Sequence, residues 1–331
     1  MSQIVRFFAV AFCWLSIPVL SFAQGKDLTR IRVSYSSIGA ASLSTWVAAD
    51  AGIFNKHGLD VGLIYIGGGP RAMSTTIANE TQITQGAGTG SILAKVGGAD
   101  TVMFATLLNT TPQSLMVHPD LRSPQELRGK KLGVTRFGAL SDFGVRKYLQ
   151  KINLDPEKDV VILQLGGLPE ILAAMQSGAI HGGALSSPAL TKAKHLGFKE
   201  LMDLVNLGIQ YPGLSYMTTE AYIKTHRIVV INFLKAIIES THSLKRNKDF
   251  TIRVLKKYTK MDEPAVLDET YELFTQRYFR LVPTPSGEEV KTVLDQIKDP
   301  KARTTDYESF IRTDLIREIE QSGFIKGLAK G

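Results

Sequence analysis

Apolar positions in the first hundred residues alternate between short continuous runs and helical spacing. The runs Ile31–Tyr35, Val61–Ile66 and Val102–Leu108 predict strands, and a shorter one lies near Ile83. The apolar positions from Ser42 to Lys56 recur at helical spacing and predict a helix. Strands that alternate with helices predict an α/β fold with a largely parallel sheet.

The same pattern starts again further along the chain. Leu132–Thr135 and Val160–Leu165 read as strands, and Ser141–Gln150 and Pro169–Gln176 as helices. The two stretches align at an offset of 99 residues, which superposes the glycine turn at 67–70 on the one at 166–169. An internal repeat explains this alignment, and convergent turn chemistry is the alternative. Under either explanation, both stretches place a glycine-rich turn before a helix.

After Tyr216 the strand pattern stops and helical spacing continues. Apolar positions such as Ile231, Leu234 and Ile238 lie on one face, which predicts that these helices pack onto the rest of the fold. The predicted helices span residues 227–244, 249–258, 264–279, 287–297 and 306–322.

The first 23 residues have the three parts of a secretory signal peptide. Arg6 is their only charge, Phe7–Leu20 is a short apolar run, and Ser21 and Ala23 are the small residues before a cleavage point. The run is shorter than the ~20 residues of a membrane span, so an uncleaved anchor is the weaker alternative. The only cysteine, Cys13, lies in this leader, so we expect a periplasmic mature chain without disulfide, thiolate nucleophile or cysteine metal ligand.

Composition fits a globular protein of two domains. The chain has 331 residues, of which 44% are hydrophobic and 21% charged, and its formal net charge is +8. The positive charge is scattered along the chain, which argues against nucleic-acid binding. The basic stretch from Lys245 to Lys260 reads as a solvated helix face, with docking to an acidic partner as the alternative.

Catalytic motifs are absent from the sequence. The turn Gly67–Arg71 is not followed by the Gly-Lys-Ser/Thr of a phosphate loop, and Ser91 stands where the dinucleotide pattern requires its last glycine. There is no nucleophile elbow and no His-Glu-x-x-His, and the six histidines are spread singly. We therefore expect no catalytic residue, no metal and no cofactor.

The predicted carboxyl ends of the strands carry hydroxyl, amide and glycine residues, with Arg136 as the one candidate cation. Ligands bind at this edge of open α/β sheets, and helix starts attract anions. The alternative for Arg136 is a solvated position at the end of a loop. The alternative ligand chemistry is a ring that stacks on an aromatic side chain, with Tyr35, Trp46, Tyr211 and Tyr216 as candidates. Asp142 and Glu170 are interpreted as acids in the first turn of a helix. The candidate ligand-binding residues are Ser36, Ser37, Gly67, Gly68, Gly69, Thr89, Ser91, Asn109, Arg136, Ser186 and Ser187.

Three segments together resemble a known family. They are Ala48–Val61, the glycine turn that follows, and Ser123–Val134 with its Leu127–Lys131 segment. In these the chain resembles periplasmic substrate-binding proteins of ABC importers, in the branch that binds aliphatic sulfonates, taurine, nitrate and the pyrimidine precursor of thiamine. The resemblance extends over residues 30–324, nearly the whole mature chain.

The resemblance implies the two-lobed periplasmic-binding-protein fold of type II, with a hinge between the lobes. We expect residues 28–111 and 218–331 in lobe 1, with the helical C-terminal part packed there, and residues 112–217 in lobe 2. The two chain crossings are expected near Thr110–Gln113 and Gly208–Tyr216. Loops that match those lining the family's cleft add Gly88 and Ser141 to the candidate ligand-binding residues.

The implied function is that of an extracytoplasmic solute receptor. It would bind a small polar or anionic organic molecule between the lobes and deliver it to an ABC permease in the inner membrane, as a monomer without catalysis. One alternative is an enzyme on the same scaffold, of the pyrimidine-precursor synthase or desulfinase type, although those activities depend on cysteine. The other alternative is a soluble sensor or adaptor without an importer.

Overall fold

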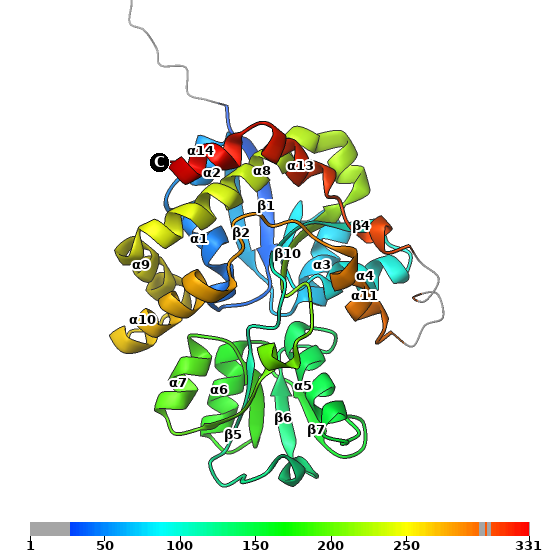
Figure 1. Ribbon diagram of the computed structural model, residues 1–331, viewed down its shortest axis with the longest axis vertical. Coiled ribbons are helices and arrows are strands. Elements are labelled where there is room, and N and C mark those ends of the chain that lie inside the picture. The colour runs from blue at the N-terminus through cyan, green and yellow to red at the C-terminus, as the bar shows by residue number, and fades with distance from the viewer. Residues whose placement is uncertain (1–26, 298–301, 303–305, 331) are drawn as a thin grey trace, which may run out of the picture.

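The computed structural model describes residues 27–297, 302 and 306–330, so the predicted leader lies outside the described residues. The chain forms two α/β lobes, one above the other in Figure 1. The first lobe has a five-stranded sheet of order β2-β1-β3-β10-β4, in which β10 runs antiparallel to its neighbours. Its strands are β1 (Thr29–Tyr35), β2 (Leu59–Tyr65), β3 (Ile83–Gly86), β4 (Thr101–Leu108) and β10 (Leu214–Thr219). Its first helices are α1 (Leu43–Asp50), α2 (Ile53–Lys56), α3 (Gly69–Ile77) and α4 (Thr89–Val96), with the 3-10 turn Ala40–Ser42 before α1.

The second lobe repeats this arrangement. Its sheet has the order β7-β6-β8-β5-β9, in which β5 runs antiparallel to its neighbours. Its strands are β5 (Ser114–Val117), β6 (Lys131–Val134), β7 (Val161–Gln164), β8 (Gly182–Leu185) and β9 (Lys199–Asp203). Its helices are α5 (Leu140–Lys151), α6 (Leu168–Gln176) and α7 (Ala189–His195), with 3-10 turns at Pro124–Leu127 and Leu204–Leu207.

The second sheet is built from the consecutive strands β5 to β9, whereas the first sheet takes β10 from beyond them. β5 follows β4 but lies in the second sheet, and β10 follows β9 but lies in the first. The chain therefore passes between the lobes twice, through residues 109–113 and 204–213. The lobe boundary expected at residue 217 falls within β10.

The structure supports the internal repeat over convergent turns. α6 has the bounds of α3 shifted by the 99 residues seen in the sequence, and β8 has those of β3 shifted by the same number. Because the two sheets also share one strand order, the similarity extends to whole lobes and is not confined to the glycine turns.

The chain after β10 is helical and packs on the first lobe. α8 contributes Phe233, Leu234, Ile237 and Ile238, all without solvent exposure, to the core that contains β1 and α1. The elements are α8 (Glu220–Arg246), α9 (Lys248–Thr259), α10 (Pro264–Leu273), a π-helical turn (Phe274–Tyr278), α11 (Gly287–Leu294), a 3-10 turn (Tyr307–Phe310), α13 (Asp314–Gln321) and α14 (Phe324–Lys330).

This helical tail also covers the edge of the first sheet. β4 lies at that edge, yet all its residues are buried. Arg280 donates its backbone N–H to the Leu107 carbonyl (3.1 Å), and Arg312 donates its own to the Met103 carbonyl (2.8 Å). The tail thereby satisfies backbone groups that an exposed edge strand would offer to another chain.

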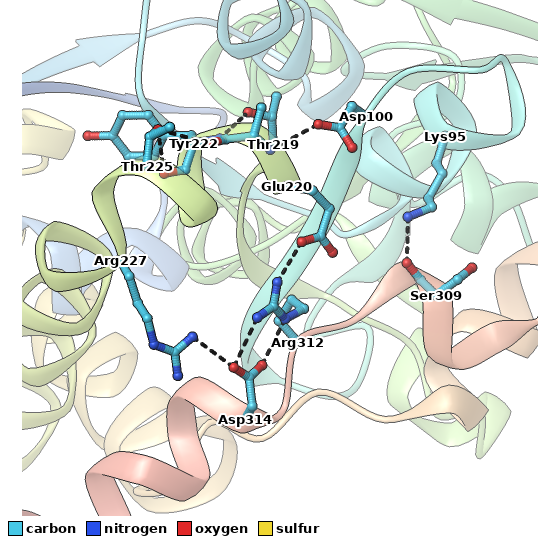
Figure 2. Close-up of polar contacts among 11 residues, drawn as sticks. Lys95, Asp100, Thr219, Glu220, Tyr222, Thr225, Arg227, Ser309, Arg312 and Asp314 are labelled. Atoms are coloured by element: carbon cyan, nitrogen blue, oxygen red, sulfur yellow. Dashed lines mark hydrogen bonds and ion pairs between the residues drawn. The ribbon is translucent and has the colours of Figure 1, made fainter.

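Charged side chains hold α13 against the start of α8 (Figure 2). The Asp314 carboxylate accepts hydrogen bonds from Arg227 (2.9 Å) and from Arg312 (2.8 Å), and Arg312 also donates to Glu220 (2.6 Å). These two arginines lower the pKa of Asp314 to about 2, with the hydrogen bond from Arg312 as the largest cause. The acid is therefore ionised at neutral pH and joins two helices that lie far apart in the sequence.

Three predicted helices are divided. Gly52, at φ +67°, separates α1 from α2 within Ser42–Lys56. The helix predicted over 264–279 changes to a π-helical turn after Leu273. The one predicted over 306–322 is interrupted where Ile311 pairs with Met103 of β4, because tertiary pairing overrides the local helical pattern.

Other bounds were also mispredicted. α8 begins at Glu220 rather than at residue 227, and His226 (φ −130°, ψ 36°) kinks it near the expected start. β5 and β9 were not predicted, because neither is followed by an α-helix and both therefore lie outside the strand–helix alternation. β10 extends to Thr219, beyond the point where the strand pattern was expected to stop.

Candidate ligand-binding site

A cavity of about 50 Å³ lies between the lobes. Both lobes, both crossings and the starts of two helices contribute to its wall. Among the described residues of that wall, none carries a charged side chain. The wall residues are Ser36, Ser37, Ala41, Gly68, Gly69, Gly86, Ala87, Pro112, Gln113, Thr135, Ala139, Leu140, Ser141, Ser186, Gly213 and Leu214.

One helix from each lobe begins at this wall. α3 starts at Gly69 after Gly68, with Pro70 in its first turn, and α5 starts at Leu140 after Ala139. Neither helix has a side-chain N-cap, so first-turn N–H groups remain free of helical partners. These N–H groups and the helix dipoles favour an anion at the cavity.

Two nearly fully buried side chains of the wall have polar atoms without a partner. Gln113 Oε1 and Ser186 Oγ make no hydrogen bond, although the residues are only 6% and 4% exposed. Next to the wall, the side-chain nitrogen of Gln85 is also unpaired. Because buried polar groups are nearly always hydrogen-bonded, these atoms indicate a place for a polar ligand or water.

Arg136, the candidate cation, lies beside the cavity and is not one of its wall residues. Its side-chain stem packs against Gly68 of the opposite lobe, where an added Cβ would lie 2.2 Å from Arg136 Cγ. Its Nε is buried without a partner. Burial raises the pKa of the neighbouring Tyr65, and Glu170 raises it further, whereas Arg136 lowers it. The Arg136 side chain therefore lies at the interface of the lobes, next to Gly68 and Tyr65 of the first lobe.

The structure brings together six of the thirteen candidate residues as wall residues: Ser36, Ser37, Gly68, Gly69, Ser141 and Ser186. The other seven, apart from Arg136, make contacts that support the fold around the cavity. An added Cβ at Gly67 would lie 2.6 Å from the Gly166 carbonyl oxygen, and one at Gly88 would lie 2.2 Å from Met103. The Thr89 hydroxyl pairs with Tyr211 (2.5 Å), and the Ser187 hydroxyl with Thr191 (2.9 Å).

Ser91 and Asn109 make local hydrogen bonds through their backbone carbonyls, whereas the buried Ser91 hydroxyl has no partner. The Ser91 carbonyl accepts a hydrogen bond from the Thr101 hydroxyl (2.8 Å), and the Asn109 carbonyl accepts one from the Tyr211 N–H (3.1 Å). The first-turn acid Asp142 accepts the Gly138 N–H (2.9 Å) and pairs with Arg146 (2.7 Å). Asp142 thus orders the start of α5, as expected.

Sequence reasoning missed Gln113 and Thr135. Gln113 follows Pro112 in the first crossing, and the crossings were not considered as part of the cleft wall. Thr135 is the last residue of a predicted strand, and its hydroxyl pairs with that of Ser141 (2.9 Å). The 99-residue offset was the signal for Thr135, because it superposes this residue on the candidate Ser36.

The aromatic candidates lie outside the described wall. Trp46, Tyr211 and Tyr216 have no exposed surface, and the Tyr216 hydroxyl pairs with Thr45 (2.9 Å). Burial raises the pKa of both Tyr211 and Tyr216. These rings belong to the packed interior, so stacking of a ligand ring on them has no support.

The lobes touch at the edge of the cavity. The Ala40 N–H donates to the Ser187 carbonyl at 3.0 Å. Gly67 and Gly166, which are equivalent under the 99-residue offset, lie face to face. This arrangement is closed, and glycine at position 67 permits it because a side chain there would strike the Gly166 carbonyl of the other lobe.

Three of the seven basic residues from Lys245 to Lys260, at the end of α8 and along α9, form ion pairs. Lys248 lies between Asp268 and Glu272, Lys256 contacts Asp262, and Lys257 contacts Asp50. These pairs are intramolecular, and nothing about the stretch indicates an acidic partner.

A larger groove of about 690 Å³ lies at the opposite edge of the first sheet, where β1, β3 and β4 begin. It is lined from one lobe alone, and no buried unpaired polar side chain belongs to its wall. In the part of the chain that the structure describes, no cluster of three metal-binding side chains occurs and no helix is long and apolar enough to cross a bilayer.

A family model described as NMT1/THI5 like matches residues 41–249. No curated protein matches the chain. Among solved structures, a Bordetella bronchiseptica protein is similar with a TM-score of 0.80 at 18% identity, covering 89% of this chain and 98% of that one. The nitrate-binding protein NrtA of Synechocystis has a TM-score of 0.75 at 12% identity, with 89% of each chain covered.

The alkanesulfonate-binding protein SsuA of Xanthomonas axonopodis, bound to MOPS, has a TM-score of 0.71 at 17% identity and covers 81% of this chain and 91% of that one. At these identities the similarity establishes the fold, which is the two-lobed periplasmic-binding-protein fold expected from the sequence.

Proposed function

Since this chain belongs to the NMT1/THI5-like family, we propose that it is a periplasmic solute receptor of an ABC importer. In this proposal the monomeric mature protein binds a small polar or anionic organic molecule between its lobes and delivers it to a permease in the inner membrane. The chain catalyses no reaction on that molecule.

The observation that carries this proposal is the closed cavity between the lobes, with unpaired polar groups on its wall. Gln113 and Ser186 come from a crossing and from the second lobe, while α3 and α5 add one helix start from each lobe. Separation of the lobes would dismantle this wall, so a ligand would be enclosed only in the closed form. Two of the similar structures are named as binding proteins for alkanesulfonate and nitrate, both anions.

The chemistry available at the cavity favours binding over catalysis. The described wall contains hydroxyls, one amide and backbone groups, and no acid, histidine or lysine that would transfer a proton. The only cysteine is Cys13 of the predicted leader. A cysteine-dependent enzyme on this scaffold would therefore lack its nucleophile after cleavage.

Screening of sulfonates, carboxylates, nitrate and pyrimidines by thermal shift tests the proposal, with calorimetry on each compound that stabilises the protein. A receptor shows one-to-one binding, stabilisation that follows RT ln(1 + [L]/Kd), and ligand recovered unchanged. Turnover of a ligand by the purified mature chain contradicts the proposal, and so does stabilisation by cations alone.

Cavity size predicts a preference for compact ligands. At about 10–15 Å³ for each water-sized group, 50 Å³ accommodates about four such groups. Acetate or methanesulfonate should then bind more tightly than octanesulfonate, because a long chain holds the lobes apart. Calorimetry on alkanesulfonates of increasing length measures this, and affinity that rises steadily with chain length contradicts it.

Uptake of the identified ligand tests delivery to the permease. A strain that lacks this gene should lose high-affinity uptake and regain it with the complete gene. Binding without any uptake defect would instead favour a sensor or adaptor.

A further inference from the structure

One ion pair and one histidine–carboxylate contact join the lobes away from the cavity, between α7 of the second lobe and α10 of the helical tail. Lys192 on α7 donates a hydrogen bond to the Glu263 carboxylate just before α10. One turn further on, His195 Nε2 lies 3.3 Å from Glu269 Oε1 on α10. Figure 1 shows α10 directly above α7 at one side of the molecule. None of the four residues belongs to the cavity wall.

Among the described residues, no other contact between a basic side chain or histidine and a carboxylate connects the lobes. The neighbouring Lys194, also on α7, pairs with Glu200 of its own lobe. The hydrogen bond from Lys192 lowers the pKa of Glu263, which keeps that carboxylate charged. When the lobes separate, Lys192 and His195 move away from their partners, whereas the Lys194 pair stays intact.

We propose that the α7–α10 pairs form a latch that stabilises the closed form, with or without ligand. The pairs exist only when the lobes are closed, so their free energy shifts the ratio of closed to open molecules. The four side chains are between 27% and 58% exposed, so salt screens them and their effect is several-fold at most. The latch makes ligand retention depend on ionic strength through groups that never touch ligand, and this consequence rests on the proposed receptor function.

A charge-swap cycle tests the latch. Lys192→Glu and Glu263→Lys each place two like charges together, and the double variant restores an opposite pair. Lys194→Glu is the matched control, because it makes the same charge change on the same helix within one lobe. The mature chain has no cysteine after leader removal, so dyes on Lys224→Cys and Gln150→Cys, which are exposed on different lobes, report lobe separation by single-molecule energy transfer.

At low salt, each reversed variant should lower the closed-to-open ratio two- to fivefold without ligand, and the double variant should restore it to within twofold. Raising the salt should lower the ratio in the unchanged protein, where it screens an attraction, and raise it in Lys192→Glu, where it screens a repulsion. The latch is wrong if the ratio is unchanged in Lys192→Glu, if Lys194→Glu lowers it equally, or if no closed population exists at low salt.

The energy-transfer measurement of lobe separation needs no ligand, so it tests the latch even if the thermal-shift screen finds no ligand. If a ligand is found, its dissociation rate should rise two- to fivefold in each single variant. In the double variant the rate should return to the value of the unchanged protein. Normal ligand binding with an unchanged closed-to-open ratio rejects the latch and leaves the receptor function standing.

Discussion

At the residue scale, two separate features of the structure favour glycine at position 68. Its φ of +86° is a conformation that side chains disfavour, and an added Cβ would strike Arg136 of the other lobe. Gly98 has a similar φ of +94°, but an added Cβ there meets nothing within 4 Å. A comparison of substitutions at Gly68 and Gly98 therefore distinguishes the effect of backbone strain from the effect of obstructing lobe closure.

We expect Gly68→Ala and Gly98→Ala both to lose about 1–3 kcal/mol of stability, because both strain the backbone. Only Gly68→Ala should weaken ligand binding, by tenfold or more, because only there does the new methyl group separate the lobes. Urea unfolding and calorimetry measure the two effects. Equal affinities in the two variants would show that Gly68 does not control closure.

Arg136 gives a second prediction at this scale. Its Nε is buried and unpaired beside the cavity, so a charge-assisted hydrogen bond to an anionic ligand is worth roughly 1.5–3 kcal/mol. Arg136→Ala should weaken binding about tenfold or more, flatten its salt dependence and change stability little. Arg32→Ala, an exposed arginine outside the cavity wall, is the control. Unchanged affinity in Arg136→Ala would leave anion binding to the helix starts alone.

At the scale of elements, the pairing of Asp314 attaches α13 to α8 (Figure 2). Its folded pKa of about 2 lies below its ordinary value of 3.8, so the ionised form stabilises the fold. That contribution is fully present above pH ~4 and is lost as the pH falls toward 2. Because Asp314 is 41% exposed, screening limits the contribution to about 1 kcal/mol.

Asp314→Asn should therefore lower the free energy of unfolding by about 1 kcal/mol at pH 7, and the difference from the unchanged protein should shrink as the pH falls from 4 to 2. Urea unfolding at several pH values measures it. Asp295→Asn, which breaks an exposed pair between Lys291 of α11 and the residue that follows that helix, is the control and should change stability less. A difference that grows on acidification would contradict the assigned direction.

At the scale of the whole molecule, the helical tail belongs to the first lobe's core. Phe233 packs against Phe54, Phe104 and Tyr216, which belong to α2, β4 and β10. A fragment of residues 28–219 would expose this apolar surface along with the edge of β4. We expect it to show no cooperative thermal unfolding by circular dichroism, whereas the complete mature chain should. A cooperative, soluble fragment would mean that the tail is a separate domain.

The sequence by itself was sufficient for the α/β alternation, the glycine turns, the repeat offset and most helices. These features are local: a run such as Ile31–Tyr35 has a readable period, and a turn such as Gly67–Pro70 has its own chemistry. Six of the sixteen wall residues followed for the same reason, since residues such as Ser36, Gly68 and Ser141 lie where strands end or helices begin.

Only the tertiary structure decided which segments meet. β5, β9 and β10 are short, and their pairing partners define them better than their patterns do. Gln113 is a wall residue because a crossing passes between the lobes. Arg136 is not one, and the stem of its side chain packs against Gly68. Such contacts join residues far apart in the chain, and no period or motif encodes them, because they depend on how two independently packed lobes close on each other.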